Sequence, residues 1–250
     1  MGWSVRRGPD AALATALASS DGIGDQGRLL PTGRLEAFSD GVFAIAITLL
    51  VLELHVPGRG EVLVRSLEHE WPRYLAYVVS FAFIGGVWIA HSNMTRFIKA
   101  ADPALMRLNL TLLLFVSLLP FTTAIAATHL FASFLAFDDH GGGPGLAERV
   151  AAVVFGLNLT LAALLVYRVI RHAARTPGIA ADDLAEEELQ AFARERRAAA
   201  QLQAGATAVG VFFPVIATVF YLAVSVLFLV EPLRHLNLRR RRAAEPGPGR

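Results

Sequence analysis

The stretch Ala37-Phe-Ser-Asp-Gly-Val-Phe-Ala-Ile-Ala-Ile-Thr-Leu-Leu-Val-Leu-Glu-Leu54 decides the fold of this chain. As an α-helix it extends about 27 Å at 1.5 Å per residue, close to the roughly 30 Å hydrocarbon thickness of a bilayer. It lacks the alternation of apolar and polar residues that marks a barrel strand. We therefore predict a membrane-spanning helix that carries one internal carboxylate, Asp40.

The rest of the chain repeats this pattern. Of the 250 residues, 54% are hydrophobic and only 18% are charged, whereas soluble domains have about a quarter charged. The absence of cysteine excludes disulfides and thiolate metal sites. We predict an all-α membrane protein whose other apolar stretches are Tyr74–Ala90, Leu105–Leu130, Val150–Ile170 and Ala204–Val230.

Arginines orient these helices. Arg6, Arg7, Arg28 and Arg34 precede the first span, which places that side in the cytosol by the positive-inside rule. Basic residues also flank both sides of the last apolar stretch, so an even number of crossings is expected, and Pro214 stands where a turn would divide it. We predict six spans, with both termini cytosolic; one long final span with an external C-terminus is the alternative. The predicted spans are about 34–55, 73–96, 105–130, 149–171, 196–212 and 214–231.

Three parts follow from this topology. We expect a flexible cytosolic tail over residues 1–33, a six-span domain over 34–236 and a basic cytosolic tail over 237–250, in a plasma-membrane protein. The segment Ala180–Arg197 begins with acidic residues and ends with arginines, which suits a helix macrodipole and predicts a solvated cytosolic helix.

Polar residues within the spans are costly and therefore informative. Asp40 lies about 9 Å beyond Arg34 along the first helix, and the opposite direction of the second span brings His91 and Asn93 to the same cytosolic depth, where Asn109 begins the third. These groups form either interhelical hydrogen bonds, each worth about 0.6–2 kcal/mol, or a gating element. A hydrolytic triad of Ser39, Asp40 and His91 is disfavoured because neighbouring helical residues point about 100° apart. We predict no enzyme and no metal site.

A stripe of Ile45, Leu49 and Leu52 recurs on one face of the first helix, with Thr48 beside it. On spacing alone such a stripe indicates packing. The chain has no T-V-G-Y-G filter loop, so any ion selectivity would arise without that carbonyl cage.

The segment Arg34-Leu-Glu-Ala-Phe38-Ser39-Asp40 resembles the R-x-x-x-F-S-D signature of the prokaryotic transmembrane protein 175 family of potassium-permeable channels. The likeness continues through Trp88-Ile-Ala-His91 and from Leu108-Asn109-Leu110 to Pro120-Phe121, and it covers most of Arg34–Thr128. Ser92 departs from the pattern, since many relatives carry a second histidine there.

The resemblance implies a homotetramer of six-span subunits whose first helices line a central pore. It makes Ile45 the narrowest hydrophobic ring, followed by Leu49 and Leu52, with Thr48 hydroxyls supporting selectivity. It also implies an interhelical network that supports the pore helix, made of Arg34, Phe38, Ser39, Asp40, Trp88, His91 and Asn109.

The sequence thus predicts a potassium-selective leak channel. A proton-coupled transporter, with Asp40 and His91 as a relay, and a non-conducting membrane scaffold are the alternatives. The expected partners are other copies of the chain and the lipid bilayer, without nucleic acid, and the expected ion is permeant K⁺ without a cofactor.

Overall fold

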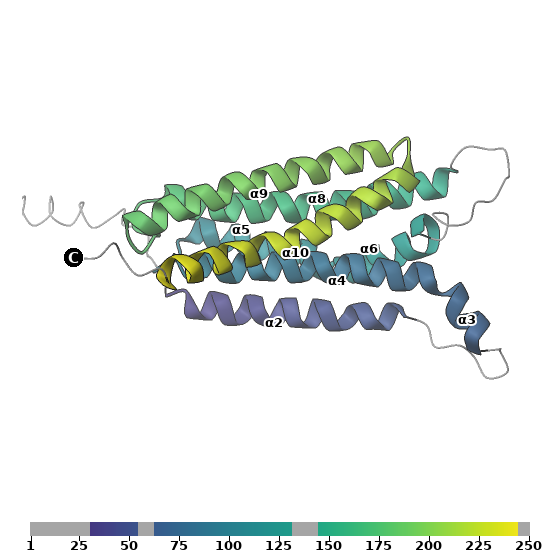
Figure 1. Cartoon of the computed structure of the whole chain (residues 1–250), viewed down its shortest axis with the longest axis horizontal. Helices are drawn as coiled ribbons and strands as arrows, with labels where there is room; N and C mark the ends of the chain where they lie inside the picture. The colour runs from purple at the N-terminus through teal and green to yellow at the C-terminus, as the bar shows by residue number, and fades with distance from the viewer. Residues whose placement is uncertain (1–30, 55–62, 132–144, 245–250) are drawn as a thin grey trace, which may run out of the picture.

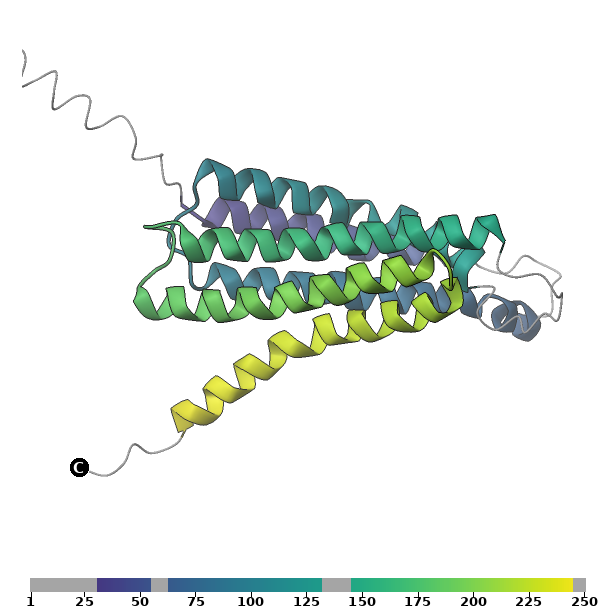
Figure 2. The ribbon, with the colours of Figure 1, turned by 90° about the horizontal axis from the view of Figure 1, so that it is seen from above.

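The computed structural model describes residues 31–54, 63–131 and 145–244. These residues form a bundle of long, roughly aligned helices (Figures 1 and 2). The predicted N-terminal tail up to residue 30 and the last six residues of the predicted C-terminal tail lie outside the described residues. The helices are α2 (Gly33–Leu50), α3 (Leu63–His69), α4 (Trp71–Thr95), α5 (Pro103–Ser117), α6 (Leu119–Ala126), α8 (Leu146–Arg175), α9 (Asp183–Gly210) and α10 (Pro214–Ala244), with short helical turns η1 (Val51–Glu53) and η2 (Ala127–Phe131).

Helix α2 lies at one side of the bundle, along α4, α5 and α6 (Figure 1). It buries Leu35, Ser39, Phe43, Ala46 and Leu50, which recur at steps of three and four and so form one helix face. Phe43 and Leu50 are fully enclosed by the core. This face fixes the rotation of α2, and therefore determines which of its residues remain uncovered.

A proline breaks the third predicted span. Helix α5 ends at Ser117 and α6 begins at Leu119, with Pro120 in its first turn. Because proline has no N–H, it cannot continue the hydrogen-bond ladder from α5. The third span then ends in the wider π-helical turn η2, so it consists of three successive helical segments rather than one helix.

Glycines permit two close helix contacts. A Cβ on Gly86 of α4 would lie 2.5 Å from the backbone carbonyl carbon of Phe228 in α10. On α8, a Cβ at Gly156 would overlap the Tyr221 hydroxyl, which donates a 2.8 Å hydrogen bond to the Ala152 carbonyl oxygen. Both positions need glycine because backbone or a rigid ring occupies the space.

Helices α8, α9 and α10 form the side of the bundle away from α2 (Figure 1). Asp182 caps α9 by accepting a 2.7 Å hydrogen bond from the Ala185 N–H. The charged segment predicted as a separate cytosolic helix is continuous with the predicted fifth span, as one helix packed along α8. After the turn at Val211–Phe213, Pro214 begins α10 at the position where a break was predicted.

Within the described residues, four helical segments are long and apolar enough to cross a membrane. They are Gly33–Glu53, Trp71–Thr95, Pro103–Phe131 and Leu146–Arg175. Pro214–Val230 is a shorter apolar helix. The chain is therefore a multi-pass α-helical membrane protein, and the six-span arrangement stays a prediction.

Candidate functional site

A chain of hydrogen bonds joins α2, α5 and α4 at one depth. Ser39 donates its proton to the Leu35 carbonyl oxygen at 2.7 Å, so its oxygen is available to accept the 2.8 Å bond from Asn109 Nδ2. The Asn109 Oδ1 therefore faces His91 Nε2, 2.9 Å away, and accepts from it. This series of hydrogen bonds thus requires that His91 carries its proton on Nε2. All three side chains are buried, and His91 is only 3% exposed.

Of the residues predicted to meet at this depth, His91 and Asn109 are joined, and Ser39 of α2 takes the place expected of Asp40. The ring of Phe43 of α2 packs against the ring of His91, with the two ring centroids 5.7 Å apart, and so covers His91 on the side of α2. Because the Ser39 hydroxyl, both polar atoms of the Asn109 amide and Nε2 of His91 are hydrogen-bonded, this contact can exist within a membrane at low cost.

Asp40 belongs to a second contact. Its Oδ1 accepts a 2.9 Å hydrogen bond from Trp88 Nε1 of α4, and both side chains are exposed in the isolated subunit. Asp40 follows Ser39 directly, and successive helical residues point about 100° apart. Ser39 therefore ties α2 to the interior, while Asp40 lies at the edge of its uncovered face.

Arg34 and Phe38 are placed differently from the other predicted network residues. Arg34 is exposed and has no hydrogen bond or ion pair within the described part of the chain. Phe38 is also exposed, on the uncovered side of α2. The structure therefore does not bring these two residues into the Ser39–Asn109–His91 contact within one subunit.

The uncovered face of α2 contains the predicted pore residues. Ile45 is 60% exposed, Leu49 42% and Leu52 70%. In α2 and η1 together, only 28% of the apolar stretch is buried, against 50–61% in the other three membrane-length segments. The side chain of Thr48 donates to the Ile45 carbonyl oxygen at 2.9 Å, which leaves its oxygen lone pairs directed outward.

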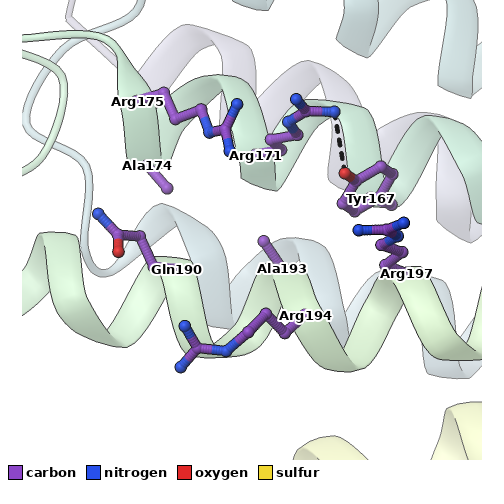
Figure 3. Close-up of a pocket in the computed structure, with 8 residues that line it drawn as sticks. All are labelled: Tyr167, Arg171, Ala174, Arg175, Gln190, Ala193, Arg194 and Arg197. Atoms are coloured by element: carbon purple, nitrogen blue, oxygen red, sulfur yellow. Dashed lines mark hydrogen bonds between the residues drawn. The ribbon is translucent and has the colours of Figure 1, made fainter.

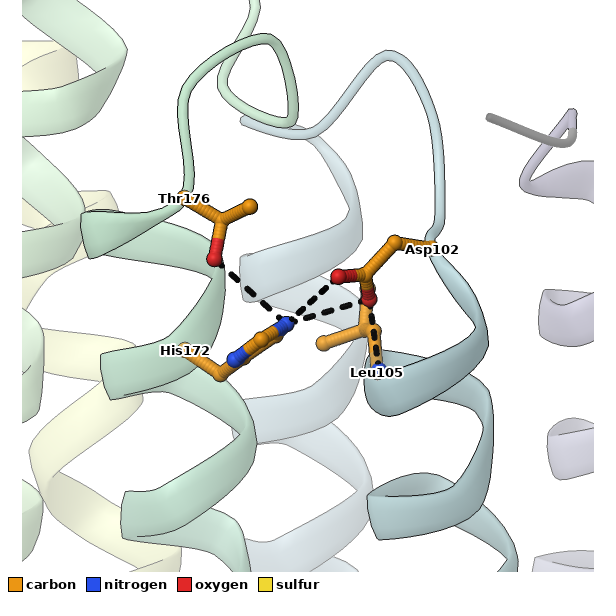
Figure 4. A network of polar contacts seen from close by, with 4 residues as sticks. All are labelled: Asp102, Leu105, His172 and Thr176. Carbon is orange, nitrogen blue, oxygen red and sulfur yellow. Dashed lines mark hydrogen bonds and ion pairs between the residues drawn. The ribbon is translucent and has the colours of Figure 1, made fainter. Parts of the chain in front are cut away.

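A third polar contact joins α5 and α8 near the short connection that follows α4 (Figure 4). Asp102 caps α5 by accepting from the Leu105 N–H at 2.7 Å, and its carboxylate lies 2.9 Å from His172 Nε2 of α8. Thr176 lies 3.4 Å from the same nitrogen. Burial raises the pKa of Asp102, but the hydrogen bonds from Leu105 and His172 and nearby positive charge outweigh it, so the pKa lies below its ordinary value.

Our reading of the sequence missed this Asp102–His172 contact. The signal was present in Asp102-Pro103, since an aspartate followed by proline before an apolar run is typical of a helix start. Its partner was not predictable, because only the packing of α5 on α8 brings His172 to it.

The bundle, its buried polar layer and the uncovered face of α2 define a multi-pass membrane protein with an incompletely covered first helix. A family model described as endosomal/lysosomal potassium channel TMEM175 matches residues 34–120. A potassium channel from Streptomyces collinus is 43% identical over 148 residues, which cover 58% of this chain and 66% of that protein.

A potassium channel from Chamaesiphon minutus is 38% identical over 170 residues, covering 66% of this chain and 77% of that one. The crystal structure of a lysosomal potassium-selective channel TMEM175 homologue from the same organism matches with a TM-score of 0.66 and 34% identity, covering 80% of this chain and 97% of that one. The chain belongs to the TMEM175 family, as its sequence resemblance predicted.

Proposed function

We propose that this chain is the subunit of a potassium channel whose pore is lined by the uncovered face of α2. Two relatives named as potassium channels and a solved potassium-selective homologue support the transported ion. The predicted homotetramer of six-span subunits, with cytosolic termini in the plasma membrane, belongs to the same proposal. Four copies of α2 around one axis would cover the face that a single subunit leaves open.

The observation that carries the proposal is that α2 leaves polar as well as apolar side chains uncovered. Ile45, Leu49 and Leu52 would be stable against lipid, but Asp40 and Thr48 are exposed on the same helix. An aspartate facing hydrocarbon costs about 2.5–3.5 kcal/mol at the centre of a membrane helix. A first helix that exposes a carboxylate and a hydroxyl as well as an apolar stripe suits a narrow aqueous passage better than a lipid surface.

In this passage, a ring of Ile45 side chains forms the constriction. Such a ring closes by losing its water, and a small widening rewets it. Potassium holds its hydration shell less tightly than sodium, so it passes the ring at lower cost. The outward lone pairs of Thr48, one turn beyond, offset part of the dehydration. The buried Ser39–Asn109–His91 contact holds the helix in the required rotation.

Purified protein in liposomes with an outward potassium gradient tests the proposal. The Ile45→Asn variant should raise resting flux and reduce discrimination against sodium, because a polar ring stays wet. Leu157→Asn is the matched control, since Leu157 is 49% exposed on α8, a helix not packed against α2. It should leave flux unchanged.

The possible outcomes separate the parts of the proposal. Potassium flux equal to that of empty vesicles would reject conduction. Equal effects of Ile45→Asn and Leu157→Asn would reject the constriction while leaving conduction intact. Saturable uptake that requires a pH gradient would indicate the proton-coupled transporter in place of the channel.

A further inference from the structure

A basic pocket lies between α8 and α9, on the side of the bundle away from α2. It has a volume of about 290 Å³ and is lined by four arginines and no carboxylate. Figure 3 shows Arg171 and Arg175 extending along α8, with Arg171 directed to the Tyr167 hydroxyl, and Arg197 of α9 beside the Tyr167 ring, while Arg194 extends over α9.

These arginines are not neutralised by the protein around them. Among the described residues, no carboxylate lies within ion-pair distance of Arg171, Arg175, Arg194 or Arg197. Arg171 donates a 3.0 Å hydrogen bond to the Tyr167 hydroxyl and lies 5.7 Å from that ring's centre. The tyrosine positions this guanidinium without cancelling its charge. Like charges that line one pocket repel one another, so an anion bound among them would be stabilising.

A second pocket continues the basic surface. It has a volume of about 350 Å³, shares Arg171 and Arg175 with the first, and adds Arg168 and His172. Arginine suits such a site because its planar guanidinium donates two parallel hydrogen bonds to a phosphate. The shared chemistry is therefore that of a phosphate-bearing anion, and both pockets are at the small end of the range for ligand sites, about 300–1,000 Å³.

The position along α8 identifies the source of the phosphate. Arg168 is the first charged residue after the apolar interior of α8, and Tyr167 precedes it, as an amphipathic ring does at a membrane interface. From Tyr167 to Arg175 the helix rises about 12 Å, across the headgroup zone of one leaflet. The abundance of arginine assigns this to the cytosolic leaflet, whose surface is anionic.

We propose that the pocket binds the headgroup of an anionic phospholipid from the cytosolic leaflet. Guanidinium groups from α8 and α9 bind the same phosphate, and this shared ligand links the two helices to each other and to the bilayer. A lipid at this site would be on the outer flank of the subunit, remote from the helix proposed to line the pore. Lipid binding at this site can therefore be tested independently of potassium conduction.

Native mass spectrometry of the purified full-length protein tests this proposal, with phosphatidylglycerol and phosphatidylcholine of the same acyl chains as probes. The wild type should retain phosphatidylglycerol preferentially. The Arg175→Gln/Arg197→Gln variant should bind it about 25-fold more weakly, at about fivefold per arginine. Arg175→Lys/Arg197→Lys should bind with intermediate strength, because the charges remain but the paired hydrogen bonds are lost.

The matched control is Arg96→Gln/Arg107→Gln, which removes two exposed arginines from outside both pockets and should leave binding unchanged. Equal losses in the pocket and control variants, or no preference in the wild type, would overturn the site. Displacement of the lipid by millimolar glycerol phosphate would assign the pocket to a soluble anion and overturn the lipid. If the glutamine variant does not fold, the wild type is measured between about 50 and 200 mM salt. A preference for phosphatidylglycerol that does not change over this range would likewise overturn the site.

Discussion

Replacing Asn109 by leucine removes the central member of the buried polar layer while keeping a side chain of similar size. The variant loses the 2.8 Å bond to Ser39 and the 2.9 Å bond to His91. Interhelical hydrogen bonds in membrane proteins average about 0.6 kcal/mol and reach about 1.7. His91, 3% exposed, also retains a donor with no acceptor. We expect Asn109→Leu to lower the free energy of unfolding by about 1–3 kcal/mol.

A double-mutant cycle isolates the bond between α2 and α5. Ser39→Ala alone loses a bond within its own helix, to Leu35, together with the bond from Asn109. Combined with Asn109→Leu, it should cost less than the sum of the two changes, by about 0.6–1.7 kcal/mol. Titration with SDS in mixed micelles, followed by circular dichroism, measures these unfolding free energies.

Asn158 provides the control for this cycle. It is also a buried asparagine, and it donates a 3.0 Å hydrogen bond to Thr122, but it lies on α8, which is not packed against α2. Asn158→Leu combined with Ser39→Ala should be additive. A coupling of zero for the Ser39 and Asn109 pair, or one no larger than in this control, would refute the reasoning that the polar layer fixes α2.

Two other changes test the packing and the pH response. Gly86→Ala places a Cβ 2.5 Å from the backbone carbonyl carbon of Phe228 and should destabilise by about 1–3 kcal/mol in the same titration, whereas Gly85→Ala meets only a flexible side chain at 3.6 Å and should be tolerated. Because the pKa of Asp102 is lowered from 3.8 by folding, its contribution is present above that value and is lost as the pH falls through the folded pKa. Thermal melts should therefore show the wild type losing its advantage over Asp102→Asn below about pH 4, and parallel curves for the two proteins would contradict the assignment.

The sequence predicted the helices that face lipid well, because the length of an apolar stretch directly indicates a membrane-spanning helix. It also predicted that Asp40, His91 and Asn109 would reach one depth, which helix rise and direction determine. It did not reveal that Asn109 bonds to Ser39 whereas Asp40 bonds to Trp88, since this depends on the rotation of α2. That rotation follows from the whole buried face of α2, in which Phe43 and Leu50 pack beside the hydrogen-bonded Ser39, and no spacing rule specifies this packing.

Helix α9 shows a different limit of sequence reasoning. Its charged first half and its alanine-rich second half differ in composition, so they were predicted as separate elements. In the structure, small residues such as Ala193 and Ala200 are buried on the same side throughout, and they allow α9 to lie closely along α8 as one helix. Close packing through alanine leaves no apolar run, and therefore no signal that a hydropathy window detects.

The neighbouring residues Ser39 and Asp40 show how one helix both holds its place and presents a face outward. Ser39 is enclosed and every hydrogen bond in its contact is internal. A carboxylate has about four acceptor positions, whereas among the described residues Asp40 accepts from one donor, Trp88 Nε1, and remains exposed. The remaining positions are costly in hydrocarbon but inexpensive in water. Helix α2 is therefore best matched by hydrated surroundings at the depth of Asp40 and by a dewetting constriction at the depth of Ile45.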